Sequence, residues 1–181
     1  MKKYYYLITL LFFVCITSFG QKYKTEESYI KFYSSAPMED IEAVNESSTS
    51  IIDMDSKNIV IVIPITSFEF PKELMQEHFN ENYLESDKYP KATFKGKLTN
   101  WDGQEGKSSA TAEGTLELHG VSKEIKIDGE IDKKGDALNM SAVFIIKLED
   151  YKIKIPKAVF YKIAEEVEVT AKFDYKPYAK N

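Results

Sequence analysis

The sequence has no arginine, only two histidines and a single cysteine, Cys15, among its 181 residues. Cys15 lies in an apolar N-terminal segment, so no disulfide can form in the rest of the chain, and its stability must come from buried apolar side chains. No H-x-H, H-E-x-x-H or paired-cysteine motif is present, which excludes the common metal sites. The G-x-S-x-G turn of serine hydrolases and glycine-rich phosphate loops are also missing. We therefore expect no metal, no cofactor and no catalytic residue, so that the protein is not an enzyme.

The N-terminus has the pattern of a secretory signal peptide. Two lysines open the chain, and the apolar run Tyr4–Ile16 and the small residues Ser18 and Gly20 follow. The run is shorter than the roughly 20 residues of a membrane-spanning helix, which disfavours a retained anchor. We predict a signal peptide over 1–20 and a mature chain over 21–181, located in the periplasm or secreted and without a membrane span. The alternative is a lipid-modified Cys15, although bulky residues precede it.

Loss of the two N-terminal lysines changes the formal net charge from −5 to −7. An acidic chain without a lysine cluster beside aromatic residues argues against nucleic-acid binding. The same charge disfavours attachment to anionic lipid surfaces. No repeat or linker divides residues 21–181, so we expect a single domain.

Alternating apolar and polar residues dominate the chain from Ser28 onward and predict short antiparallel strands. The inward faces of the later strands contain the apolar members of four runs: 92–98, 110–118, 125–131 and 138–146. A last alternating run covers 167–173. The stretch Ile59–Ile65 is apolar on both parities and is expected to be covered on both faces.

One helical stretch interrupts this pattern. Apolar residues spaced by three and four predict a helix over about 71–84, and the pattern changes to a period of two at Pro90. Many strands with one helix predict a mainly β fold, and closure into an antiparallel barrel would remove exposed strand edges. A sandwich is the alternative.

The two histidines are expected to have structural roles. His78 lies between apolar residues of the helical stretch, where we expect a half-buried side chain bonded to the backbone. His119 precedes the turn residue Gly120, so a surface or turn-stabilising role is expected.

Small residues on the inward faces bear on whether the interior holds a ligand. They are Ala92, Gly96, Ala110, Ala112, Gly114, Gly129 and Ala142. An interior formed by about eight strands can be filled by side chains or can enclose a small ligand. These residues are compatible with a cavity and equally with a core that bulky neighbours fill.

Two motifs resemble those of the YceI-like family of lipocalin-like, polyisoprenoid-binding proteins. The first is M-x-x-H-F-x-x-x-Y-L-E-S-x-K-Y-P-x-A-T-F, from Met75 to Phe94, and the second is G-T-L-E-L-H-G-V-S-K-E-I, from Gly114 to Ile125. The arginine that the family pattern often places upstream of the helix histidine is absent. The resemblance implies an eight-stranded lipocalin-like barrel, with one short α-helix covering it in our reading.

The resemblance also implies a function. The expected protein is an exported, non-catalytic lipid-binding barrel that holds a polyisoprenoid or another long-chain apolar lipid. The residues expected to line its cavity, from their parity in the strands and their face of the helix, are Phe94, Leu98, Ala112, Gly114, Leu116, Met140, Phe144, Phe79 and Tyr83. The alternative is a structural or stress-response interaction protein with a filled core. Whether the barrel forms a homodimer is left open.

Overall fold

The computed structural model describes residues 21–35, 40–155 and 164–178. The predicted signal segment 1–20, with Cys15, lies outside the described residues. Nine strands are present in this part of the chain: β1 (Lys22–Ser34), β2 (Ile41–Asn45), β3 (Thr49–Asp53), β4 (Asn58–Pro64), β5 (Lys91–Thr99), β6 (Gly106–Leu118), β7 (Val121–Lys134), β8 (Ala137–Lys147) and β9 (Glu166–Tyr178).

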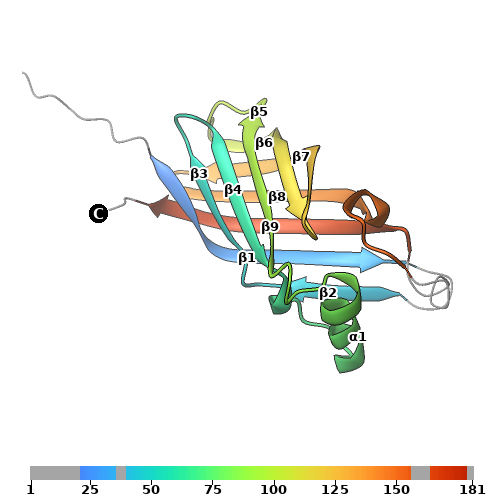
Figure 1. Cartoon of the computed structure of the whole chain (residues 1–181). Coiled ribbons are helices and arrows are strands. Elements are labelled where there is room, and N and C mark those ends of the chain that lie inside the picture. The colour runs from blue at the N-terminus through green and yellow to red at the C-terminus, as the bar shows by residue number, and fades with distance from the viewer. Residues whose placement is uncertain (1–20, 36–39, 156–163, 179–181) are drawn as a thin grey trace, which may run out of the picture.

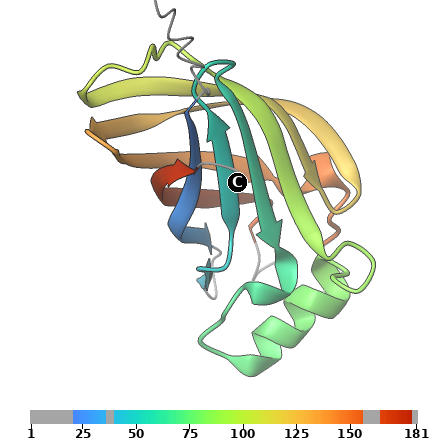
Figure 2. The ribbon, with the colours of Figure 1, turned by 90° about the vertical axis from the view of Figure 1, so that its left-hand side faces the viewer.

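The strands form an antiparallel sheet that closes on itself, because β1 pairs with β9 (Figures 1 and 2). β2 and β3 share one edge of β1, since Ile30 pairs with Asn45 of β2 and Lys24 pairs with Ile51 of β3. These two short strands occupy one position in the barrel, which therefore has eight positions formed by nine strands. The expected antiparallel eight-stranded barrel is confirmed.

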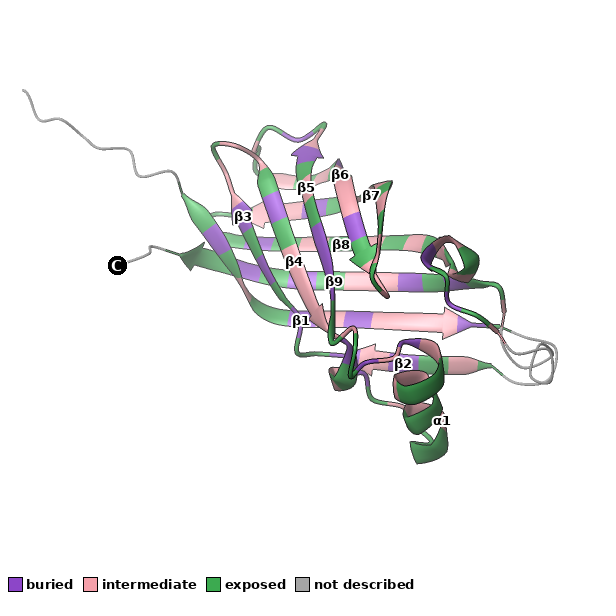
Figure 3. Ribbon diagram, viewed as in Figure 1, coloured by how far each residue is buried: buried purple, intermediate pink, exposed green. Residues whose placement is uncertain are grey.

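The alternating pattern has the expected effect on burial, as the bands along the strands show (Figure 3). Phe94, Leu98 and Leu116 are buried on the inside, while Lys95 on the opposite parity is exposed. The prediction that Ile59–Ile65 is covered on both faces was wrong at Val60, whose side of β4 faces solvent with 39% exposure. The helix covers another part of the barrel.

The helix consists of α1 (Glu73–His78) and a following π-helical turn, η2 (Phe79–Tyr83). It begins after Lys72, whose φ of −125° is extended, so the helix is slightly shorter at its start than the predicted 71–84. A 3₁₀ turn, η1 (Ile65–Ser67), leads from β4 towards it. The helix lies at one end of the barrel, beside β2 and the end of β4 (Figures 1 and 2).

The opposite end of the barrel is closed by side chains. Tyr23 of β1, Ile52 of β3 and Leu138 of β8 are fully buried there, and Trp101 follows β5. Lys133 forms an ion pair with Glu105 at the same end. None of these buried side chains borders the two cavities described below, which lie in the middle of the barrel and at the end with the helix.

Candidate ligand-binding site

The end of the barrel beside the helix contains a cavity of about 450 Å³, which we call the outer chamber. This volume lies within the range of about 300–1,000 Å³ that is usual for small-molecule sites. The walls come from β1, β2, β4, β5, β6, β8 and β9, from α1 and η2, and from two 3₁₀ turns, η1 and η3 (Leu148–Tyr151). Apolar side chains form most of this surface.

Phenylalanine rings form one wall of the outer chamber. The rings of Phe32 and Phe79 stack with centroids 5.5 Å apart, and Phe68 and Phe70 each contact both of these rings. Aromatic contacts of this kind orient the rings beyond what burial alone does. They also attach the helix residue Phe79 to β1 and thereby position the helix at the mouth of the chamber.

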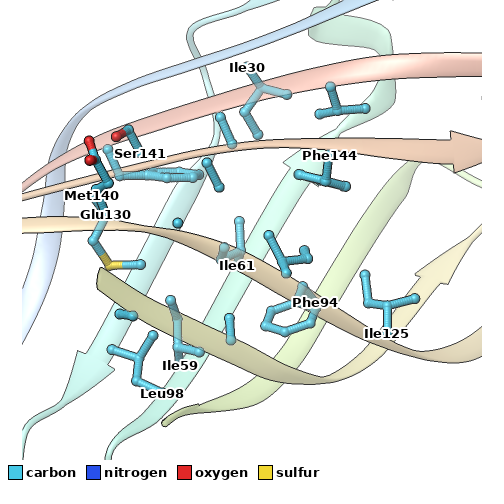
Figure 4. Close-up of a pocket in the computed structure, with 18 of the residues that line it drawn as sticks. Ile30, Ile59, Ile61, Phe94, Leu98, Ile125, Glu130, Met140, Ser141 and Phe144 are labelled. Carbon is cyan, nitrogen blue, oxygen red and sulfur yellow. The ribbon is translucent and has the colours of Figure 1, made fainter. Parts of the chain in front are cut away.

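A second cavity, the inner chamber, lies deeper in the barrel and has a volume of about 90 Å³. Isoleucine, leucine, phenylalanine and alanine side chains from β4 to β9 form most of its wall (Figure 4). Glu130 and Ser141, which pair with each other across β7 and β8, are the polar residues at its border. The inner chamber can thus accept an apolar chain but offers few hydrogen-bonding partners.

The two chambers share part of their walls, so they adjoin inside the barrel. The shared residues are Ile30, Ile63, Leu116, Phe144 and Val169. Together the chambers form an elongated apolar space that runs from the helix end towards the closed end. A linear hydrocarbon chain could occupy both chambers and would contact mainly apolar side chains there.

Eight of the nine predicted lining residues border this space. The inner chamber contains Phe94, Leu98, Ala112 and Met140, the outer chamber contains Phe79 and Tyr83, and both contain Leu116 and Phe144. Burial raises the pKa of the Tyr83 phenol above its ordinary value, so the side chain is neutral at physiological pH. Gly114 borders neither chamber.

The family model of the YceI-like domain matches residues 22–175. The chain belongs to the YceI-like family. A search of curated proteins finds no match, but solved structures resemble this one.

A polyisoprenoid-binding domain from Saccharophagus degradans, implicated in plant cell wall breakdown, is 17% identical, covers 86% of this chain and 98% of its own, and has a TM-score of 0.75. Burkholderia cenocepacia BcnA is 15% identical over 81% of this chain and 95% of its own, with a TM-score of 0.70. The Campylobacter jejuni YceI protein is 22% identical over 74% of this chain and 81% of its own, with a TM-score of 0.57. At these identities the similarity establishes a shared fold.

The small inward residues of this YceI-like protein have different roles. Ala110, Ala112 and Ala142 border the inner chamber, where their short side chains leave space. Gly129 also borders this chamber, but a Cβ atom there would lie 2.5 Å from the carbonyl oxygen of Ser141, so this glycine allows the close approach of β8. Gly96 has a different role, because a Cβ atom there would lie 2.6 Å from the Phe94 ring and 2.5 Å from the carbonyl oxygen of Glu113. Its missing side chain makes room for Phe94.

Sequence reasoning missed a part of the outer chamber that does not come from the strands. Phe68 and Phe70 lie between η1 and α1, while Leu148 and Ile153 lie in η3 and just after it. The alternation in S-F-E-F-P could have indicated the two phenylalanines, since two apolar residues flank one acidic residue. The sequence around Leu148 and Ile153 has no comparable pattern.

The structure differs from the expectation for His78 and agrees with a turn-stabilising role for His119. His78 is exposed at the border of the outer chamber, so the prediction of a half-buried side chain was wrong. His119 is largely enclosed: its Nδ1 donates to the carbonyl oxygen of Tyr151 at 3.0 Å, and its Nε2 lies 2.8 Å from Oε2 of Glu85. The ring also contacts Tyr89, with centroids 4.7 Å apart. His119 thus connects the β6–β7 turn to η3 and to the segment after the helix.

Among residues 21–35, 40–155 and 164–178, no group of three or more histidine, cysteine, aspartate or glutamate side chains could hold a metal ion. Within the same residues, no helix has the length and apolar character needed to cross a membrane.

Proposed function

We propose that this protein is an exported, non-catalytic lipid-binding protein that holds an elongated apolar ligand of the polyisoprenoid class. The observation that carries the proposal is the pair of adjoining apolar chambers, with about 450 Å³ and 90 Å³ of space. A binding protein from Saccharophagus degradans with the same fold is described as polyisoprenoid-binding, which supports the choice of ligand class.

The free energy of such binding can come from burial alone. Each methylene removed from water contributes about 0.8 kcal/mol, while association costs on the order of 4–15 kcal/mol. A chain of a few isoprene units therefore offsets this cost without a charged contact. The absence of arginine is compatible with such a mode of binding, because the hydrocarbon chain rather than the head group supplies the affinity.

Export is part of the proposal, and its support is the N-terminal sequence: two lysines, an apolar run and small residues before Gln21. In the periplasm or outside the cell, a carrier would shield an apolar chain from water. We also propose that the protein binds its ligand without catalysing a reaction, since the chamber walls contain few polar groups.

One native mass spectrometry experiment tests both parts. Protein is produced with its complete N-terminal segment, recovered from the exported fraction, stripped of lipid and offered geranylgeraniol. The proposal predicts a chain that begins at Gln21 and binds one geranylgeraniol molecule. A chain that retains residues 1–20 would contradict the signal peptide, and the absence of a complex would contradict the binding function.

A further inference from the structure

The wall of the barrel is incomplete between β7 and β8. These strands pair from Lys134 and Ala137 to Gly129 and Ala142, and the pairing ends there. Yet β7 remains paired with β6 as far as Val121, and β8 remains paired with β9 as far as Lys147. The segments 121–128 and 143–147 are therefore strands with one unpaired edge each, and Figures 1 and 2 show them diverging. We call the space between them the β7–β8 seam.

Burial decreases along β7 and β8 from the closed end of the barrel towards the seam. The inward side chains of Ile131 and Leu138 have exposures of 1% and 0%. Met140, which pairs with Ile131, is only partly buried, and so are Ile127 and Phe144 beside the seam. The interior of the barrel is thus less covered at the end of the pairing and along the seam than at the closed end.

The seam borders both chambers. Ile125, Ile127 and Ala142 line the inner chamber, Ile146 lines the outer chamber, and Phe144 lines both. Glu130 and Ser141, the pair next to the point where the β7–β8 pairing ends, are beside the inner chamber (Figure 4). A molecule that passed between β7 and β8 would reach the whole elongated space from its side, without first moving through the helix end.

The outer surface beside the seam is suited to an apolar molecule. Val143 and Ile145 of β8 point outward and are 59% and 54% exposed. Both are flanked by the unpaired edge of their own strand, so an apolar chain can contact them before it enters.

The far end of the seam is held together by η3, which contacts both β7 and β8. Lys123 of β7 forms an ion pair with Asp150 of η3, and His119 bonds to the carbonyl oxygen of Tyr151. The seam is therefore fixed at one end by the Gly129–Ala142 pair and at the other end by η3. Between these two points no backbone hydrogen bonds join β7 to β8. Strand segments without ladder hydrogen bonds are displaced at lower free-energy cost than paired ones.

We propose that the β7–β8 seam is the entrance of the ligand-binding site, through which a flexible apolar chain passes sideways into both chambers. This inference rests on the proposed lipid-binding function and adds the route to it. A sideways route suits a long linear chain, because the chain need not thread end-first through the barrel.

A removable cross-link tests this route. Lys126 and Ile145 would face each other if the β7–β8 register continued past Gly129–Ala142, so a Lys126→Cys/Ile145→Cys variant places one thiol on each side of the seam. Lys97 of β5 pairs with Glu113 of β6 and both side chains are exposed, so Lys97→Cys/Glu113→Cys is the matched control across a closed part of the wall away from the seam. Both variants carry Cys15→Ala and are joined by a bismaleimide whose linker contains a disulfide.

The probe is all-trans-retinol, a fluorescent isoprenoid alcohol, and stopped-flow fluorescence gives its association and dissociation rates. If the ligand enters through the seam, the cross-link should slow both association and dissociation of retinol by at least about tenfold. The equilibrium affinity should change by less than about threefold, because blocking an entrance changes the rates of binding and not the free energies of the free and bound states. Reduction of the linker should restore the rates in the same sample, which excludes misfolding. The control should retain wild-type rates.

Two outcomes would overturn the inference in distinguishable ways. Unchanged rates across the linked seam, with retinol still bound, would mean that the ligand enters elsewhere and would leave the binding function intact. A wild-type protein that does not bind retinol at all would contradict the proposed function and the entrance together.

Discussion

Gly114 and Gly96 face each other across β6 and β5 so closely that a Cβ atom on Gly114 would lie 2.4 Å from the Cα of Gly96. The same Cβ would lie 2.2 Å from the carbonyl oxygen of Lys95. Both contacts are with backbone atoms, which cannot move aside as a side chain can. The pair therefore allows the two strands to bend towards each other inside the barrel wall.

Gly114→Ala should lower the free energy of unfolding by about 3 kcal/mol, the upper end of the usual range for overpacked cores. Chemical denaturation followed by circular dichroism measures it. Lys95→Ala, on the outward face of the neighbouring strand, is the control and should change stability by less than about 0.5 kcal/mol. Equal stability of Gly114→Ala and Lys95→Ala would show that the strands do not approach so closely.

Ala112→Trp should fill part of the inner chamber and weaken the binding of geranylgeraniol by at least about tenfold, or ~1.4 kcal/mol. Ala112 borders that chamber, while Lys95 points away from it, so Lys95→Ala should retain wild-type affinity. Overpacking adds a stability cost of about 1–3 kcal/mol, so the unfolding curve is recorded alongside. A folded Ala112→Trp protein with unchanged affinity would place the ligand outside the inner chamber.

Replacement of each histidine by alanine should affect stability differently, because His119 connects three segments and His78 is exposed. His119→Ala removes two hydrogen bonds that join three segments and should cost about 1–3 kcal/mol of stability. His78→Ala alters an exposed side chain and should cost less than about 0.5 kcal/mol. Thermal and chemical unfolding measure the difference, and similar losses for both variants would contradict the enclosed position of His119.

Tyr175 should make stability fall with pH in the alkaline range. Its hydroxyl is fully buried and donates to Oγ of Ser50 at 2.8 Å, and burial raises its pKa well above the ordinary 10.0. Below pH 10 the phenol is protonated in both the folded and the unfolded chain. Above pH 10 only the unfolded chain loses this proton, so stability should fall by up to about 1.4 kcal/mol for each pH unit.

Tyr175→Phe isolates this contribution. The variant loses the hydrogen bond to Ser50 and should be about 1–2 kcal/mol less stable than the wild type at pH 8. It has no phenol to ionise at this position, so the difference between the two proteins should narrow as the pH rises above 10. Urea denaturation at several pH values measures it, and a constant difference up to pH 11.5 would mean that Tyr175 ionises as readily when folded.

The sequence predicted most of the barrel because alternation records which side of a strand is buried. This is why Phe94, Leu98, Leu116 and Phe144 were correctly assigned to the interior. Parity cannot distinguish a side chain beside a cavity from a position where two strands meet, and Gly114 was assigned to the cavity for that reason.

Other features depend on contacts between distant segments. The alternation of β7 continues beyond Gly129, whereas β8 changes after Ala142 to the uninterrupted apolar run Val143–Ile146. An apolar run usually indicates a strand that is covered on both faces, so it does not predict that the pairing of β7 and β8 ends there. The enclosure of His119 depends on Glu85 and on the carbonyl oxygen of Tyr151, which lie far away in the chain. The position of the helix at the barrel end depends on the contact between Phe79 and Phe32, which no local pattern indicates.

The central claim is that the adjoining chambers hold an apolar chain, and solvent extraction of the protein as purified tests it most directly. The extract of a known amount of protein is analysed by mass spectrometry, with Ala112→Trp protein prepared in the same way as the control. The account predicts close to one isoprenoid or other long-chain apolar lipid per wild-type molecule and much less from Ala112→Trp. A folded wild-type protein that yields no apolar lipid, and takes up none when offered polyprenols, would contradict it.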